Sequence, residues 1–320
     1  MSALLEIDGL DVAFRTEAGW LPVLDDVSLS MQPGEILGVV GESGSGKSVT
    51  ALAVMRLLGA QGAIRAGAIR LDGRELLGLD AEAMRQVRGR SIGMIFQEPM
   101  TSLNPLLRVG FQIAEVLDAH LGLGRAAAKA RVVELLAEVG IPEPAARAEA
   151  YPHHLSGGMR QRVMIAIAMA CAPRLLIADE PTTALDVTIQ AQILALMRRL
   201  RAERGSSILL ITHDMGVIAQ MADRVAVMYA GQVVETAPLR DLLTRPAHPY
   251  AKLLLAAMPT TRRKLAGLPV IPGQMPSPGS VGRGCRFRAR CPVAIGRCAE
   301  EMPVLAPLET GRAVRCWVAA

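Results

Sequence analysis

The feature that most limits what this chain can fold into is the run Gly41-Glu42-Ser43-Gly44-Ser45-Gly46-Lys47-Ser48, which has the G-x-x-x-x-G-K-S form of a phosphate-binding loop. An apolar stretch at 36–40 precedes it and a helical pattern at 49–58 follows it, as the motif requires. Its glycines let backbone N–H groups turn toward phosphate oxygens, and the helix start adds partial positive charge. We therefore predict a nucleotide site; the alternative is a Gly/Ser-rich linker that contains a lysine.

A second motif supplies the acids that nucleotide hydrolysis needs. Asp179 and Glu180 directly follow an apolar stretch at 175–178, so we expect both at the carboxyl end of a strand, where open α/β sheets bind ligands. Lys47 is predicted to reach the β- and γ-phosphates. Ser48 and Asp179 are predicted to ligate Mg²⁺, and Glu180 to act as the general base on water. An acidic pair at an ordinary strand end is the alternative.

The order of strand and helix patterns predicts an α/β fold with a mostly parallel sheet covered on both faces. Two antiparallel strands are expected between residues 4 and 29, and a terminal hairpin at 224–235. An all-helical insert is expected at about 100–173, within a catalytic domain at 1–259. Residues 260–320 are loop-rich and contain four cysteines, on which their order is predicted to depend. Further strands are expected at 36–40, 67–71, 91–96, 175–178 and 207–212.

Composition excludes several classes of protein. The net charge is +5, but the basic residues are dispersed and aromatic residues make up 3% of the chain, too few for a base-stacking surface, so we expect no nucleic-acid partner. No apolar run approaches the roughly 18 residues that span a bilayer. The first residues lack a basic region, so no signal peptide is expected and the chain is placed in the cytoplasm.

The run Leu155-Ser156-Gly157-Gly158-Met159, just before a helical pattern, resembles the signature of ATP-binding-cassette (ABC) ATPases. That resemblance implies a P-loop NTPase fold with a RecA-like mixed sheet, N-terminal antiparallel strands and an inserted helical subdomain. Gln97 occupies the Q-loop position, which contacts Mg²⁺, and His213 the switch position. Ala184-Leu185-Asp186 occupies the D-loop position, and Phe14 the position of the aromatic residue that stacks on adenine.

Each of these positions also has an alternative interpretation. His213 is then a polar residue at a strand end, Gln97 a turn former, and Phe14 a core residue. Asp186 is equally suited to be the N-cap of its helix.

The signature also has a physical interpretation. Ser156 suits an N-cap, and Gly157 and Gly158 leave the first helical N–H groups open to an anion. Because Ser156 belongs to the insert and Lys47 to the sheet, the signature is not expected to face its own phosphate loop. The resemblance implies that it completes the site of a partner ATPase in a head-to-tail dimer that holds two ATP molecules.

Residues 97–105 and 244–250 are similar to the corresponding stretches of dipeptide, oligopeptide and nickel importer ATPases. The resemblance implies a peripheral subunit on the cytoplasmic face of the inner membrane. Its partners would be two permease subunits, a second ATPase and, indirectly, an extracytoplasmic solute-binding protein. The implied substrate is a di- or oligopeptide, with nickel chelates, glutathione or opines as alternatives. Rival functions are a soluble cassette acting on ribosomes or DNA, and redox signalling through the cysteines.

Four of the five cysteines follow the spacings C-x5-C, C-x6-C and C-x17-C, unlike the C-x2-C pairs of zinc ribbons. Disulfides are disfavoured in a reducing compartment. The run 285–292 resembles the C-terminal segment of these ATPases that holds a [4Fe–4S] cluster, with zinc or unmetallated thiols as alternatives. ATP binding is expected to survive loss of such a centre. The predicted ligands are Cys285, Cys291, Cys298 and Cys316.

Overall fold

The computed structural model describes residues 2–98, 102–183, 185–258, 270–309 and 311–319. Its internal contacts divide the chain into unit 1 (Met1–Leu77 with Leu210–Ala320) and unit 2 (Gly78–Leu209). Three predicted features lie outside the described residues: residues 99–101 after Gln97, Ala184 of the D-loop position, and the domain boundary at 259/260.

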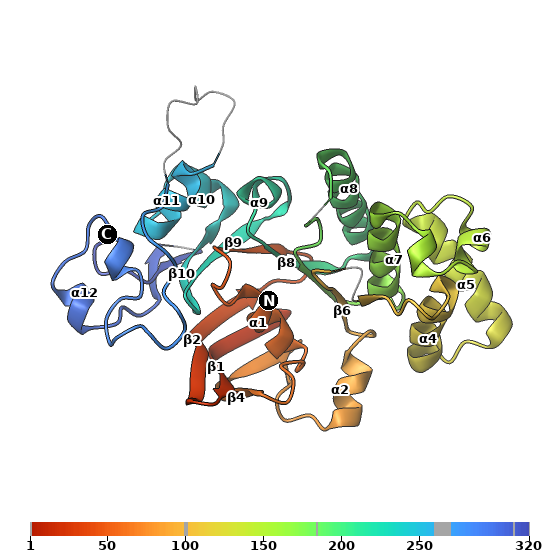
Figure 1. Ribbon diagram of the computed structural model, residues 1–320, viewed down its shortest axis with the longest axis horizontal. Helices are drawn as coiled ribbons and strands as arrows, with labels where there is room; N and C mark the ends of the chain where they lie inside the picture. The colour runs from red at the N-terminus through yellow and green to blue at the C-terminus, as the bar shows by residue number, and fades with distance from the viewer. Residues whose placement is uncertain (1, 99–101, 184, 259–269, 310, 320) are drawn as a thin grey trace. The chain divides into compact units, whose positions relative to one another are not determined.

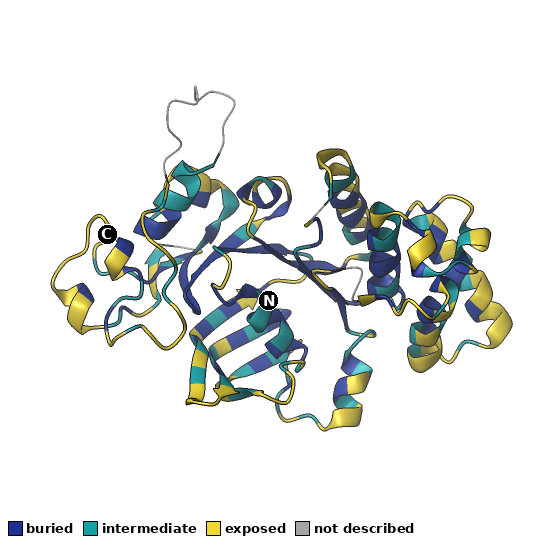
Figure 2. Cartoon of the chain, viewed as in Figure 1, coloured by how far each residue is buried: buried dark blue, intermediate teal, exposed yellow. Residues whose placement is uncertain are grey.

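Unit 1 begins with an antiparallel sheet in the order β2-β1-β4-β5 (Figure 1). Buried and exposed residues alternate along its strands, because successive side chains point to opposite faces and only one face is packed (Figure 2). The predicted antiparallel pairing of the first two strands is confirmed. The strands are β1 (Leu5–Thr16), β2 (Gly19–Met31), β4 (Gly62–Leu71) and β5 (Arg74–Glu75).

A second sheet in unit 1 includes the order β11-β12-β10-β9-β3. All five residues of β3 (Ile36–Val40) are buried, and β3 runs parallel to β9 (Arg224–Tyr229), which forms the predicted hairpin with β10 (Gln232–Pro238). A Cβ on Gly38 would lie 2.6 Å from the Ile218 side chain, so helix α9 (Met215–Met221) packs closely on β3. Helices α1 (Lys47–Val54), α10 (Leu239–Thr244) and α11 (Pro249–Ala256) also belong to unit 1.

Unit 2 carries two parallel strands and most of the helices, with α4, α5, α6 and α7 gathered where the all-helical insert was predicted (Figure 1). A Cβ on Gly93 would lie 2.1 Å from the Ala168 carbonyl oxygen, so α7 packs directly on β6. The elements are α2 (Ala81–Val87), β6 (Ile92–Ile95), α4 (Val109–Leu121), α5 (Arg125–Glu138), α6 (Pro144–Ala148), η1 (Pro152–His154), α7 (Gly157–Met169), β7 (Leu175–Asp179) and α8 (Val187–Arg204). The chain passes from unit 2 to unit 1 within β8 (Ser207–Thr212).

The C-terminal segment, described over residues 270–309 and 311–319, is more regular than its proline content suggests. Its strand β12 (Arg312–Val314) pairs with β10, and β11 (Ala306–Glu309) pairs with β12. The turn η2 (Arg288–Arg290) and the helix α12 (Arg297–Glu300) complete it. In the β12–β10 pair, Glu235 lies opposite Val314, a partner too distant along the chain for any local sequence pattern to reveal.

Candidate functional site

The predicted phosphate loop connects β3 to α1 in unit 1. In this loop Lys47 is only 5% exposed to solvent. The Lys47 ammonium group donates to the carbonyl oxygens of Gly41 (2.8 Å) and Glu42 (2.9 Å). A buried ammonium is costly without partners, so these carbonyls hold the charge at the loop. The side chain of Ser45 is fully buried, and its carbonyl accepts the N–H of Gly231 at 2.9 Å. The loop is therefore tied to the turn between β9 and β10.

Two glycines of the loop are required by its geometry. A Cβ on Gly41 would lie 2.2 Å from the Met228 carbonyl oxygen, which leaves no room for any side chain. Gly46 adopts a φ of 101° at the N-cap of α1, a left-handed conformation that L side chains rarely adopt. Both positions therefore require glycine for backbone reasons, and their part in binding phosphate stays a prediction.

Two further predicted residues also lie in unit 1. Phe14 is half-buried near the end of β1, opposite Leu21 and Gly62, and a Cβ on Gly62 would lie 3.0 Å from its ring. His213 is exposed and directly follows β8. We call residues 41–48, Phe14 and His213 the loop cluster; the adenine-stacking role of Phe14 stays a prediction.

In unit 2 the two predicted strand ends meet. Strands β6 and β7 run parallel, with Ile95 opposite Ala178, so their carboxyl ends share one edge. There the side-chain amide of Gln97 donates to the Glu180 carboxylate at 3.1 Å, and Asp179 is 5% exposed. We call Gln97, Asp179 and Glu180 the carboxylate cluster. The structure thus brings Gln97 of one predicted motif to the acidic pair of another.

Glu180 has an unusual backbone and a partner that sequence analysis missed. Its φ is 48°, a left-handed value that is uncommon for a residue with a Cβ and that costs free energy. The Thr183 hydroxyl donates to the same carboxylate oxygen as Gln97, at 2.8 Å. The spacing of Thr183, three residues after Glu180 across a proline, was the available signal.

The predicted anion site at the signature has the expected local form. Ser156 is the N-cap of α7, and its hydroxyl oxygen accepts the N–H of Met159 at 3.3 Å. Ser156 and Gly157 are exposed, and a Cβ on Gly157 would meet nothing within 4 Å. A side chain on Gly158 would instead press on Ile189 of α8, at 3.0 Å. Asp186 caps α8 by accepting the Ile189 N–H at 2.9 Å, as its alternative interpretation required.

The predicted iron–sulfur cluster is not supported. The four C-terminal cysteines form no disulfide, and burial is the main cause that raises the pKa of Cys285 and of Cys291. Among the described residues, which include all four cysteines, no group of three or more His, Cys, Asp or Glu side chains is arranged to hold a metal ion.

Strand pairing and burial also connect the C-terminal segment to the rest of unit 1. Besides the β12–β10 pairing, Arg315 is 3% exposed and its guanidinium pairs with Asp26 at 2.9 Å. Phe287 is 1% exposed and packs against Tyr229 and Tyr250, at ring-centroid distances of 5.1 and 5.5 Å. These contacts contribute to the order of the segment, and its dependence on the cysteines stays a prediction.

The chain is similar to known ATP-binding proteins of transporters. Residues 24–183 match the family model described as ABC transporter, and residues 234–298 match that of the oligopeptide/dipeptide transporter C-terminal region. A Brucella abortus protein provisionally named a peptide import ATP-binding protein is 50% identical over 98% of this chain and 94% of its own. A Sinorhizobium fredii protein provisionally named a peptide ABC transporter ATP-binding protein is 51% identical over the same shares.

A solved structure gives the same picture for the fold. A dimeric ATP-binding cassette in a post-hydrolysis state, bound to ADP and Pi, is 28% identical and has a TM-score of 0.66. It covers 74% of this chain and 99% of that one. Within the described residues, no helix combines the length and apolar character that crossing a bilayer requires.

Proposed function

We propose that this chain energises the import of di- or oligopeptides. The chain belongs to the ABC transporter family, and it is the subunit that binds and hydrolyses ATP. The observation that supports this most is the 50% identity, over 98% of the chain, to a protein named for peptide import. The match of residues 234–298 to the oligopeptide/dipeptide transporter C-terminal region points to the same substrate class. Nickel chelates, glutathione or opines are the alternative substrates.

The loop cluster would bind the nucleotide. Backbone N–H groups of Ser43, Gly44 and Gly46 would donate to phosphate oxygens, and Lys47 would exchange its carbonyl partners for the β- and γ-phosphates. This exchange is favourable because phosphate carries full negative charge, whereas a carbonyl oxygen carries only a partial one. Phe14 would stack on the adenine.

The carboxylate cluster would supply the hydrolysis chemistry. Ser48, Gln97 and Asp179 offer hydroxyl, amide and carboxylate oxygens, the donor set that Mg²⁺ prefers. Bound Mg²⁺ would neutralise charge that develops on the phosphates. Glu180 would accept a proton from the attacking water, while the donors from Gln97 and Thr183 keep its carboxylate in place. His213 would sense the γ-phosphate.

The signature residues Ser156, Gly157 and Gly158 would act on the nucleotide of a second ATPase subunit. Their exposure and the open space around Gly157 agree with such a contact, and the solved cassette with ADP and Pi is itself a dimer. The assembly would sit at the cytoplasmic face of the inner membrane, bound to two permease subunits and served by an extracytoplasmic solute-binding protein.

Peptide uptake by the living cell tests the substrate class. Deletion of this gene should abolish uptake of a radiolabelled tripeptide, and wild-type protein should restore it while Glu180→Gln should not. An Asp80→Asn variant, which alters the exposed N-cap of α2, serves as the matched control and should restore uptake. Undiminished peptide uptake in the deletion strain, together with loss of nickel or opine uptake, would contradict the proposal.

A further inference from the structure

Arg290 connects the C-terminal segment to the phosphate loop. Its guanidinium donates two hydrogen bonds to the Glu42 carboxylate, at 2.6 and 3.0 Å. The Arg290 side chain is 5% exposed and that of Glu42 29%. A bidentate pair fixes orientation as well as distance, and such low exposure leaves little screening by salt. Glu42 is the second residue of the loop, so a residue 248 positions away holds it in place.

Glu42 is held at its backbone as well as at its side chain. Its N–H donates to the Tyr250 hydroxyl at 2.9 Å, and its carbonyl oxygen accepts from the Lys47 ammonium at 2.9 Å. Any shift of Glu42 therefore moves a carbonyl that positions the lysine. The ion pair with Arg290 acts on the same residue from the side-chain end.

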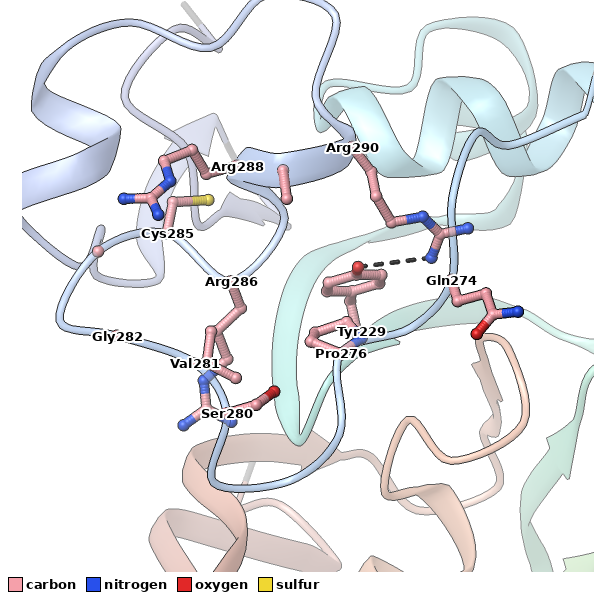
Figure 3. Close-up of a pocket in the computed structure, with 12 residues that line it drawn as sticks. Tyr229, Gln274, Pro276, Ser280, Val281, Gly282, Cys285, Arg286, Arg288 and Arg290 are labelled. Atoms are coloured by element: carbon pink, nitrogen blue, oxygen red, sulfur yellow. Dashed lines mark hydrogen bonds between the residues drawn. The ribbon is translucent and has the colours of Figure 1, made fainter.

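Arg290 is itself anchored within the C-terminal segment and on the sheet. Its Nε donates to the Pro272 carbonyl at 2.7 Å, and Nη1 donates to the Tyr229 hydroxyl at 3.4 Å (Figure 3). The guanidinium also lies 5.7 Å from the centre of the Tyr229 ring. The hydrogen bonds to Glu42 are the main cause that raises the pKa of Arg290. A guanidinium is charged at physiological pH in any case.

From these contacts we infer that Arg290 is a positioning residue for ATP binding. It holds Glu42, and with it the carbonyl that orients Lys47, and it neutralises a carboxylate that belongs to the phosphate loop. The inference rests on the proposed role of residues 41–48 as the ATP site. Arg290 lies in the C-terminal segment, outside every nucleotide-binding motif. The segment would therefore contribute to ATP affinity.

Two physical effects follow when Arg290 is shortened. A cavity of about 140 Å³ already lies beside Tyr229, Cys285 and Arg290, so the lost side chain would be replaced by water (Figure 3). The Glu42 carboxylate would then carry an unpaired negative charge within the loop that receives phosphates, and like charges repel. Both effects weaken ATP binding, but only the second disappears when Glu42 is made neutral.

That difference allows a sharp test by calorimetric titration of the full-length chain with Mg-ATP. Arg290→Gln should bind ATP about 5- to 20-fold more weakly than wild type. Adding Glu42→Gln in the same chain should restore most of the affinity, to within about threefold of wild type. Arg315→Gln removes an equally buried guanidinium from the same segment, but its partner Asp26 is outside the loop, so its affinity should be unchanged.

Hydrogen–deuterium exchange of the nucleotide-free chain gives an independent measurement. Arg290→Gln should speed exchange in a peptide that covers residues 41–48, and Arg315→Gln should not. If Arg290→Gln does not fold, Arg290→Lys keeps the charge without the bidentate geometry and should weaken ATP binding by about two- to threefold.

The outcomes separate this inference from the proposed ATP site. If Lys47→Ala binds ATP normally, the assignment of the loop is wrong. If Lys47→Ala weakens binding but Arg290→Gln binds like wild type, the positioning role is wrong. The role is also overturned if Glu42→Gln fails to rescue Arg290→Gln, or if Arg315→Gln weakens binding equally, because general loss of packing would then account for the effect.

Discussion

The loop cluster and the carboxylate cluster are held together in opposite ways. Lys47 is buried and is satisfied by two backbone carbonyls, and Gly41 is confined by the Met228 carbonyl. Glu180 is half-buried and is held by the side chains of Gln97 and Thr183, both exposed. Buried backbone contacts are costly to break, whereas exposed side-chain hydrogen bonds exchange readily with water. The backbone of the loop is therefore preformed, with Lys47 changing partners only when phosphate replaces the carbonyls, and the side-chain contacts of Glu180 can rearrange at little cost.

This comparison predicts that the two clusters control different steps. A preformed loop should set how tightly ATP binds, because little ordering remains to be done on binding. A carboxylate on a left-handed backbone position, held by exchangeable donors, should set how fast the bound ATP is hydrolysed.

The largest expected effect comes from removing the proposed general base, Glu180. Glu180→Gln should keep ATP affinity within about threefold but lower hydrolysis by about 10²- to 10⁴-fold in the assembled transporter. Phosphate release and ATP titration on the same preparation measure the two quantities. Glu203→Gln, an exposed position on α8, is the matched control and should hydrolyse ATP normally. Near-normal ATP turnover by Glu180→Gln would show that the Glu180 carboxylate is not the general base.

The next effect tests the loop cluster. Lys47→Ala should weaken ATP binding by about 10- to 100-fold, because it removes the charge that we propose pairs with the β- and γ-phosphates. Fluorescence titration with a labelled ATP analogue measures the affinity, and Lys252→Ala on the exposed face of α11 serves as control. If Lys47→Ala slowed hydrolysis without changing affinity, the division between the clusters would be wrong.

A smaller effect is expected at the residue that sequence analysis missed. Thr183→Val should lower hydrolysis by about 3- to 10-fold, because one of the donors to the Glu180 carboxylate is lost. Thr183→Ser keeps a hydroxyl at this position and should restore most of the rate. Equal losses in both variants would show that packing, and not the hydrogen bond, is what matters at Thr183.

The smallest effect concerns stability in acid. Burial lowers the pKa of His248 from 6.5 to about 3, so the folded chain keeps it neutral while the unfolded chain protonates it. Stability from this group is complete above pH 6.5 and is lost as the pH falls toward 3. Between about pH 7.5 and 5.5 the loss should be about 1.4 kcal/mol. Urea unfolding at both pH values measures it, and His248→Gln should show a flatter pH dependence.

Local motifs explain why so much of the site was predictable. A phosphate loop or a strand followed by two acids is contained within a few residues, so the chain positions these groups wherever the strand ends. To predict the pairing of Gln97 with Glu180, one would also need to know that the two strands before them are parallel neighbours. Strands β6 and β7 meet this condition. The cysteine spacing, in contrast, predicted an iron–sulfur centre, but among the described residues no group of three or more His, Cys, Asp or Glu side chains is arranged to hold a metal ion.

By itself the sequence determined the α/β fold, the phosphate loop and the strand ends that carry the carboxylates, because each follows from short-range backbone chemistry and hydrophobic periodicity. Only the tertiary structure decided that β12 would pair with β10, with Glu235 opposite Val314, and that Arg290 would hold Glu42 from 248 positions away. Contacts over such separations leave no periodic pattern, and they form only when burial of the rest of the chain brings the two segments together.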